Sequence, residues 1–389
     1  MKKQLLTIVF MLFTVFVGFG IIIPVLPAII VETGNNNFHL AMLLSVYSAV
    51  SFFMSPFWGG LSDRIGRKPV ILTGLLGFSI SFLIFGLSDG VLWMMYLSRI
   101  IGGLFSGAVA SCAVAYVADI TTEENRTKGM GFVGMAIGMG FVFGPAIGGI
   151  LSVWGSYLPF YASGALSFLV FLFALSVLKE SLTPDKRHAK DMPKPSRWTA
   201  FQGKLKYLYV LSFFVSFTLA GLESTFQLFE LERVGATSYQ IGWMFLANGI
   251  VGAAIQGGVV RRLRGKEKPA IALGLALSAA GFFLLLLSSN LIDATLYLAV
   301  FGAGNALIRP CVTSLITQRT TVGQGVATGL NSSMDSLGRI LGPLLAVAVF
   351  NWQTAVPFII GGVLCLAALL LLSRFAALDT QGTTVRPPA

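Results

Sequence analysis

Ionisable side chains are rare inside the long apolar stretches of this 389-residue sequence. Glu223 and Asp335 are carboxyl groups in such stretches, and Arg99 is a base in another. Insertion scales assign about 2.5 to 3.5 kcal/mol to an Asp, Lys or Arg at the centre of a membrane helix, so each retained charge is a candidate for function. The two histidines, His39 and His188, fall between the apolar stretches. We therefore expect a carboxylate, and not an imidazole, to carry any proton through the protein.

Glu223 has the properties of a proton carrier. An apolar environment disfavours the charged form of a carboxyl group, so a neutral Glu223 would lose its proton when a cationic compound arrives or when the site opens to water. Competition between a cation and a proton for one carboxylate is sufficient for antiport. The structural alternative is a Glu223 held by Gln227, one turn along, or by a neighbouring helix. Asp335 and Arg339 also lie one turn apart, which allows an intrahelical ion pair and leaves open a structural pair or a second coupling site.

The elements that must position these residues are membrane-spanning helices. The chain is 55% hydrophobic and 11% charged, with a mean hydropathy of +0.82. A spanning helix needs roughly 20 apolar residues, and such runs recur along the whole chain. The runs are continuously apolar, whereas barrel strands alternate over about 10 residues. The predicted spans are 5–30, 40–58, 69–87, 91–116, 129–153, 159–178, 208–230, 238–261, 269–288, 292–316, 326–350 and 355–373.

The net charge of +11 reports the topology of the chain. Most Lys and Arg residues fall in the termini, in alternate loops and in the basic stretch 179–207. By the positive-inside rule, we expect both termini and this central stretch to lie on the cytoplasmic side of the membrane. The charge therefore indicates contact with anionic lipid and not with nucleic acid.

Two halves of the sequence repeat each other. Gly59-Gly60 corresponds to Gly257-Gly258, and Gly144-Pro145 corresponds to Gly342-Pro343, both at an offset of 198 positions. A repeat with an even number of spans keeps its orientation, so these are parallel repeats with a substrate site between them near the midplane. The predicted architecture is all-α, with a six-helix half at 1–178, a cytoplasmic linker at 179–207 and a second six-helix half at 208–389.

The loop at residues 59–69, GGLSDRIGRKP, resembles the signature loop of the major facilitator superfamily. Glycine there permits a tight reversal, and a proline suits a first helical turn. The resemblance implies a charge relay that switches with conformation, formed by Asp63, Arg67 and Asp119. A plain basic anchor and turn would explain the Lys and Gly residues but not Asp63.

The fifth predicted span contains Gly140, Gly144 and Pro145 in a pattern that resembles the family's antiporter motif. Spaced glycines also allow another helix to pack closely, so simple helix packing is the alternative. Residues 97–103, LSRIIGG, resemble a third family motif, which implies a part in proton transfer for Arg99.

Residues 116–122, 158–160, 179–182, 213–229 and 308–310 resemble the drug:H+ antiporter group, in particular Gram-positive multidrug exporters of the NorA, Bmr and Blt type. The resemblance covers nearly the whole chain and implies export of fluoroquinolones, dyes and lipophilic cations in exchange for protons. Those exporters carry an Asp three residues before the Arg-Pro pair, where this chain has Ala306. A second acid is therefore missing from the tenth span.

We expect a drug site to be apolar with few polar groups. Candidates on the spans that line the family's central cavity are Glu223, Phe16, Phe213, Phe217, Phe226, Gln227, Asn248, Gln256, Asn305 and Arg309. We expect no cofactor or metal in this protein, and we expect the proton to be the coupling ion. The other partners expected are a small lipophilic substrate and the lipid bilayer, and the chain is expected to act as a monomer. Cys112, Cys311 and Cys365 fit small apolar core positions.

Other functions remain possible on these residues. A narrower exporter of tetracycline, a sugar or another metabolite would use the same fold, and a solute symporter is disfavoured by the glycine motif. An intramembrane enzyme would need a nucleophile with a nearby histidine or a metal pair, which the spans lack. A structural protein or receptor has no use for both Glu223 and the switch loop. No nucleotide-binding loop is present, so we expect a gradient and not ATP to drive the cycle.

Overall fold

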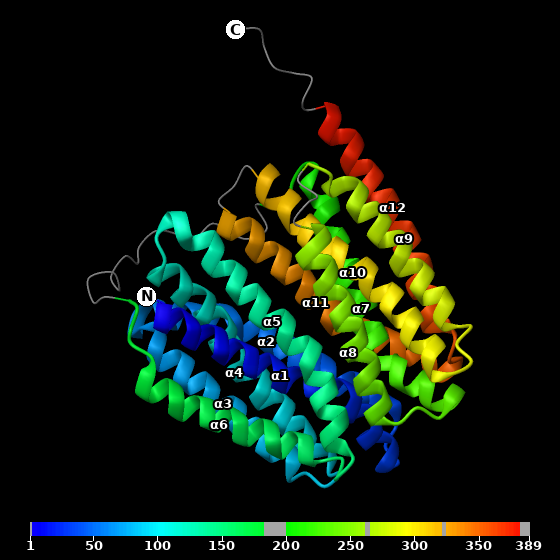
Figure 1. The fold of residues 1–389 in the computed structure, drawn as a ribbon, viewed down its shortest axis with the longest axis horizontal. Coiled ribbons are helices and arrows are strands. Elements are labelled where there is room, and N and C mark those ends of the chain that lie inside the picture. The colour runs from blue at the N-terminus through cyan, green and yellow to red at the C-terminus, as the bar shows by residue number, and fades with distance from the viewer. Residues whose placement is uncertain (1, 183–199, 261–264, 321–323, 382–389) are drawn as a thin grey trace. The chain divides into compact units, whose positions relative to one another are not determined.

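The computed structural model describes residues 2–182, 200–260, 265–320 and 324–381 (Figure 1). Within these ranges the chain is helical and has no strand, and 12 helices are long and apolar enough to cross a membrane. Helices satisfy their own backbone hydrogen bonds, which a segment in hydrocarbon must do. The predicted all-α fold with twelve spans is confirmed. Most of the predicted linker, residues 183–199, lies outside the described residues.

The chain forms two compact units. Unit 1 comprises residues 1–192 and 237–246, and unit 2 comprises 193–236 and 247–389. The first unit contains α1 (Lys2–Glu32), α2 (Asn37–Ile65), α3 (Arg67–Gly86), α4 (Leu92–Ile120), α5 (Glu123–Ser152) and α6 (Leu158–Val177). The second contains α7 (Leu205–Val234), the π-helix η3 (Ile255–Val259), α9 (Glu267–Leu285), α10 (Leu291–Arg319), α11 (Gln324–Trp352) and α12 (Val356–Gln381). Helix α8 (Ser238–Ala254) is divided between the two units, with 238–246 in unit 1 and 247–254 in unit 2. Within each unit some helices run side by side, as α3 does with α6 and α9 with α12 (Figure 1).

Helix ends in this fold are set by specific residues. Asn36 accepts a hydrogen bond from the backbone nitrogen of Phe38 at 2.8 Å and so caps α2. Asn290 caps α10 in the same way, by accepting from Ile292 and Asp293. These side chains satisfy backbone donors that have no partner inside their own helix.

The reversal between α2 and α3 takes place at Gly66. Its φ of 108° is accessible to glycine and strained for other residues. The predicted end of the second span at residue 58 is too early, because α2 continues to Ile65 and includes Gly59 and Gly60. The space beside both of these glycines is open, so neither makes the turn. One glycine is therefore enough to reverse the chain.

Glycines in α5 allow α1 to pack against it in unit 1. A Cβ on Gly144 would lie 2.7 Å from the Cα of Gly20 and from the carbonyl oxygen of Val17, and one on Gly140 would lie 2.6 Å from the Cβ of Phe16. The same relation recurs in unit 2, where a Cβ on Gly338 would lie 2.6 Å from the carbonyl oxygen of Phe213. The sequence repeat thus encodes a repeated helix contact, α1 with α5 and α7 with α11.

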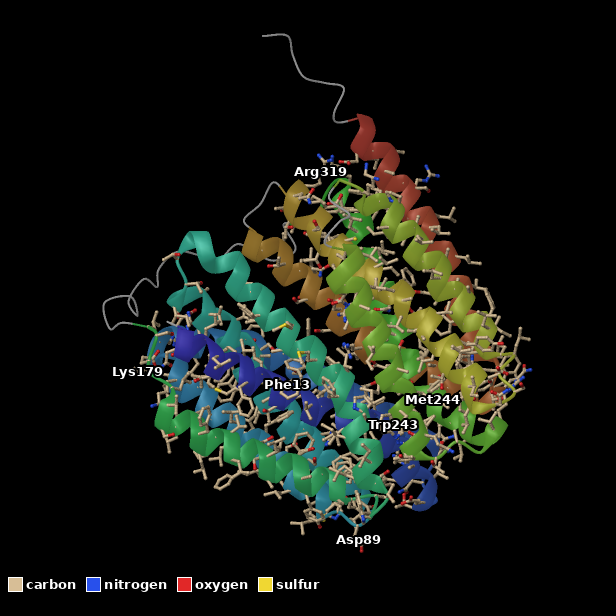
Figure 2. The ribbon with its side chains drawn as sticks, in the orientation of Figure 1. Phe13, Asp89, Lys179, Trp243, Met244 and Arg319 are labelled. Carbon is tan, nitrogen blue, oxygen red and sulfur yellow. The ribbon has the colours of Figure 1, made fainter. Side chains whose placement is uncertain are left out.

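A buried carboxylate joins four helices of unit 2. Asp379 near the end of α12 has a side chain only 2% exposed, and it pairs with Lys204 at 2.6 Å, Lys268 at 2.8 Å and Arg319 at 3.2 Å. These bases lie before α7, in the first turn of α9 and at the end of α10. Arg319 is labelled in Figure 2. Burying a charge is costly unless it is paired, so the three cations explain why Asp379 is tolerated there.

The glycine contact gives a matched test. We expect Gly144→Ala to lower the stability of the purified protein by about 1–3 kcal/mol, because the added methyl group overpacks the contact with α1. Gly138→Ala is the control, since nothing lies within 4 Å of a Cβ at that position of the same helix. Thermal unfolding in detergent should show a lower Tm for Gly144→Ala alone. An equal Tm for both variants would contradict close packing at Gly144.

Candidate functional site

Four charged side chains form a cluster in unit 2, on α7, α10 and α11. A carboxylate oxygen of Glu223 lies 3.6 Å from Nη1 of Arg339, and Oδ2 of Asp335 lies 3.4 Å from Nη2 of Arg309. We call these residues, Glu223, Arg339, Asp335 and Arg309, the charge quartet. Its two acids and two bases give a formal charge of zero when all four are ionised.

Asp335 and Arg339 each reach a different helix. Although the two residues are one turn apart on α11, Asp335 pairs with α10 through Arg309 and Arg339 pairs with α7 through Glu223. Asp335 also accepts a hydrogen bond from the hydroxyl of Ser216 on α7 at 2.8 Å. The pairs therefore connect three helices, which the spacing along one helix could not predict.

The quartet is partly open. Side-chain exposure rises from 17% for Glu223 to 22% for Arg339, 25% for Asp335 and 39% for Arg309. Within the described residues, the guanidinium of Arg309 has a single hydrogen bond, the 3.4 Å contact with Asp335. Both ion pairs are longer than the 2.6 Å contact between Lys204 and Asp379. A ligand could therefore compete for these groups more easily than for the bases around Asp379.

Close packing of α7 on α11 holds Glu223 and Arg339 within reach. A Cβ on Gly342 would lie 2.5 Å from the carbonyl oxygen of Phe217, and one on Gly338 would lie 2.7 Å from its backbone nitrogen. Both glycines flank Arg339 on α11. Larger residues there would separate the helices and break the ion pair.

The predicted aromatic residues divide into exposed and buried groups. Phe213 and Phe217 are partly exposed on α7, with ring centroids 5.8 Å apart. Phe16 on α1 is also partly exposed, and its ring lies 5.4 Å from that of Phe141. Phe226 is completely buried and Gln227 is 4% exposed, so both belong to the interior of the folded chain.

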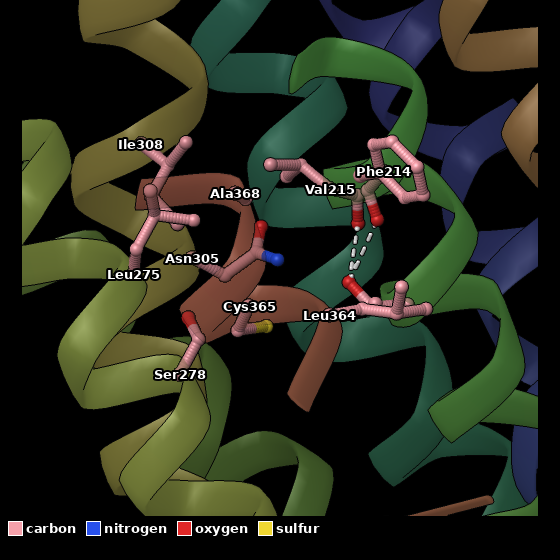
Figure 3. Close-up of a pocket in the computed structure, with 10 residues that line it drawn as sticks. Phe214, Val215, Leu275, Ser278, Asn305, Ile308, Leu364, Cys365 and Ala368 are labelled. Atoms are coloured by element: carbon pink, nitrogen blue, oxygen red, sulfur yellow. Dashed lines mark hydrogen bonds between the residues drawn. The ribbon is translucent and has the colours of Figure 1, made fainter. Parts of the chain in front are cut away.

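The predicted polar residues are dispersed. Gln256 is exposed in η3. The carboxamide of Asn248 packs against Gly302 of α10, where a Cβ would lie, so a larger residue there would require the Asn248 side chain to move. Asn305 lines a cavity of about 10 Å³ in unit 2, together with Ser278 of α9 and Cys365 of α12 (Figure 3). This cavity holds about one water molecule and is too small for a drug.

Unit 1 contains the predicted switch cluster. Nη1 of Arg67 lies 2.7 Å from Oδ1 of Asp63, and its Nε lies 3.1 Å from Oδ2 of Asp119. The same guanidinium donates to the hydroxyl of Ser62 at 2.6 Å. Arg67 therefore ties the end of α2 to the end of α4, from its own position at the start of α3. The three residues that the motif singled out lie together.

Glu180 completes this cluster and was not among the predicted site residues. Its carboxylate accepts hydrogen bonds from the backbone nitrogens of Arg67 at 2.8 Å and Lys68 at 3.1 Å. A carboxylate at a helix N-terminus satisfies orphan donors and opposes the positive end of the helix dipole. Sequence alone carries no signal for this contact, because 113 positions separate Glu180 from Arg67.

Arg99 on α4 is almost completely buried, at 3% exposure. Its Nη2 donates to the hydroxyl of Ser98 at 3.4 Å, and its Cζ lies 4.8 Å from the ring centroid of Phe85. Its Nε has no hydrogen-bond partner, and no carboxylate pairs with it among the described residues. A ring face partly offsets the charge. Arg99 is nevertheless a buried charge without an ion pair in the described part of unit 1.

A second carboxylate on α7 also escaped the sequence prediction. Glu230 is completely buried, and it accepts a hydrogen bond from the hydroxyl of Ser288 at 3.1 Å. The Nε of Arg233 donates to the carbonyl oxygen of the same serine. The loop between α9 and α10 is thereby held to the end of α7.

The three cysteines are buried and free, as predicted for core positions. Among the described residues no group of three or more His, Cys, Asp or Glu could hold a metal ion.

Comparison with known proteins gives consistent matches. The sequence model of the Major Facilitator Superfamily matches residues 8–343 and 268–388. "Multidrug resistance protein 2" of Bacillus subtilis is 32% identical over 370 residues, covering 92% of this chain and 91% of that protein. "Quinolone resistance protein NorA" of Staphylococcus aureus is 30% identical over 377 residues, covering 96% of each. The solved structure of the nucleoside transporter NupG is similar in fold, with a TM-score of 0.80 at 14% identity over 96% of this chain and 99% of that one.

The pairing across α7 and α11 can be tested with a double-mutant cycle. We expect Arg339→Gln alone to lower the Tm, because it leaves the carboxylate of Glu223 without this partner in a low-dielectric site. The double variant Glu223→Gln and Arg339→Gln should recover most of that loss, since no unpaired charge remains. Thermal unfolding in detergent measures all four proteins. Additive losses in the double variant would show that the two side chains do not interact.

Proposed function

The chain belongs to the major facilitator superfamily and is a multi-pass inner-membrane transporter, not an enzyme, and on that premise we propose that it exports lipophilic drugs in exchange for protons. The observation that carries this proposal is the charge quartet of unit 2. It offers two carboxylates that can take up protons, and its side chains are open enough to meet a ligand. The names of the two bacterial relatives, a multidrug and a quinolone resistance protein, support drugs as the substrate class.

In this proposal Glu223 is the coupling residue. Protonation removes its negative charge and so releases Arg339 from the 3.6 Å ion pair. Deprotonation restores the pair or provides a partner for a cationic group of a drug. Arginine stays charged at any physiological pH, so the protons of the quartet must reside on Glu223 and Asp335. The partly exposed Phe213 and Phe217 on the same helix provide the apolar surface that a lipophilic compound needs.

The cluster around Arg67 is proposed as the conformational switch. Its contacts join α2, α3 and α4 at one end of unit 1. Such ion pairs can exchange partners, which gives a transporter two discrete arrangements. The placement of the basic residues supports a cytoplasmic location for this cluster and for both termini. In the proposed exchange, protons enter from the side of the membrane opposite the cytoplasm, and the drug leaves toward that side.

The first experiment is efflux of ethidium from cells that express the wild type or Glu223→Gln. We expect the wild type to lose efflux when a protonophore is added, and Glu223→Gln to be at least tenfold slower at equal expression, because the glutamine cannot carry a proton. Glu232→Gln is the matched control, since Glu232 lies exposed on the same helix and has no place in the quartet.

One result would contradict proton-driven export, and a second would contradict the role of Glu223. Protonophore-resistant efflux by the wild type would rule out the proton gradient as the driving force. Full activity of Glu223→Gln would exclude Glu223 as the coupling residue and would move that role to Asp335. Retention of ethidium equal to that of empty cells would exclude ethidium as a substrate, and norfloxacin efflux then tests drug export.

A further inference from the structure

The charge balance of the quartet restricts the substrates that it can exchange for a proton. With four ionised side chains the quartet is neutral, and one bound proton leaves it with a charge of +1. A site built from carboxylates alone would be negative and would attract a simple cation. This chain instead has an arginine within 3.6 Å of each carboxylate. A substrate that offers only a positive charge must displace an arginine and leave it without a counterion.

We propose that the preferred substrates are zwitterionic amphiphiles, whose cationic and carboxylate groups open the ion pair between Arg309 and Asp335. This inference rests on the proposed proton-coupled export. The substrate's cationic group takes the place of Arg309 at Asp335, and its carboxylate becomes the new partner of Arg309. No charge is left unpaired, which is the condition for stability in a site of low dielectric constant.

Arg309 is suited to receive the carboxylate. It is the most exposed member of the quartet at 39%, and its single described hydrogen bond is a long one of 3.4 Å. A guanidinium has five donors in a fork that matches a carboxylate, so one contact to Asp335 leaves most of this capacity unused. Asp335 keeps the hydrogen bond from Ser216 at 2.8 Å while the pair opens. The acid therefore remains in position for the incoming cationic group.

Proton binding and zwitterion binding exclude each other in this arrangement. When Glu223 takes up a proton, its ion pair with Arg339 is lost. Asp335 lies four positions before Arg339 on the same helix, at a spacing that allows an ion pair. Asp335 then has two guanidinium groups beside it and no room for a third cation. Release of the proton returns Arg339 to Glu223 and frees Asp335 for the substrate, so the two ligands alternate as antiport requires.

The exchange has an electrical consequence that distinguishes substrate classes. A zwitterion carries no net charge, so its exchange for one proton moves one positive charge across the membrane. A monovalent cation exchanged for one proton moves no net charge. A potential of 100 mV is worth about 2.3 kcal/mol per elementary charge, which corresponds to about a fiftyfold concentration ratio. The potential alone should therefore drive export of a zwitterion and should not drive export of a monocation.

The test uses the purified full-length protein in liposomes and two compounds that differ in one group. Norfloxacin is a zwitterion near neutral pH, and its methyl ester is a monocation with the same ring system. With equal pH on both sides, a potassium diffusion potential with a positive interior pulls protons outward. We expect norfloxacin to accumulate in protein-containing liposomes, up to about fiftyfold at 100 mV for one proton. We expect no accumulation of the ester and none of norfloxacin in protein-free liposomes.

A second arm tests the assignment of Arg309. With a pH gradient as the driving force, Arg309→Gln should lose at least tenfold in norfloxacin transport and should retain transport of the ester, because only the carboxylate needs the guanidinium. A merely structural role for Arg309 predicts equal losses of transport for both compounds. That result would overturn the assignment. Equal responses of both compounds to the potential in the wild type would overturn the zwitterion preference while leaving proton-coupled export intact. Transport of neither compound under a pH gradient would overturn the proposed function and this inference together.

Discussion

Hydrocarbon offers no hydrogen-bond partner and no counterion, and this constraint determines the rest of the molecule. Every backbone group in a spanning segment must be satisfied within the segment, which leaves only the helix for a chain of continuously apolar runs. Every charged side chain must likewise find its partner inside the protein. The described ion pairs therefore gather in three places: around Arg67, around Asp379 and in the charge quartet. Arg99 is the exception, because its guanidinium is buried without a carboxylate in the described chain.

Close helix packing is the second requirement, because partners on different helices must come within about 4 Å. Glycine provides it where two backbones touch, at Gly144 between α5 and α1 and at Gly342 between α11 and α7. The sequence repeat places the same glycine in both units. In unit 2 the contact carries charge, since Arg339 and Glu223 pair across it. The glycine motif of α5, which resembles the family's antiporter motif, thus has a packing role in unit 1 that any function on this fold would need.

The sequence predicts the features that repeat at helical or motif spacing and misses those that depend on distant partners. Length and hydropathy are enough for the twelve spans, and the loop motif is enough to bring Asp63, Arg67 and Asp119 together. The pairing of Asp335 with Arg309 was not predictable, because the spacing on α11 favours Arg339 as its partner. Glu180 and Glu230 were missed for a related reason: each finds its hydrogen-bond donors on another helix or loop, far away in the sequence. Where the sequence allows several partners for a charged side chain, only the folded structure shows which contact forms.

Arg309 of α10 finds its carboxylate partner on α11. Exporters with the resembled pattern have an Asp three residues before the Arg-Pro pair, one helical turn from the arginine that corresponds to Arg309. In this chain that position is Ala306, and Arg309 takes its carboxylate from Asp335 instead. The arginine thus has a carboxylate partner on a neighbouring helix. With Glu223 and Arg339 as the other pair, the site has two acids and two bases. The charges of the site therefore balance within the protein. A charged ligand must replace one member of an existing ion pair, because no carboxylate of the quartet lacks an arginine partner.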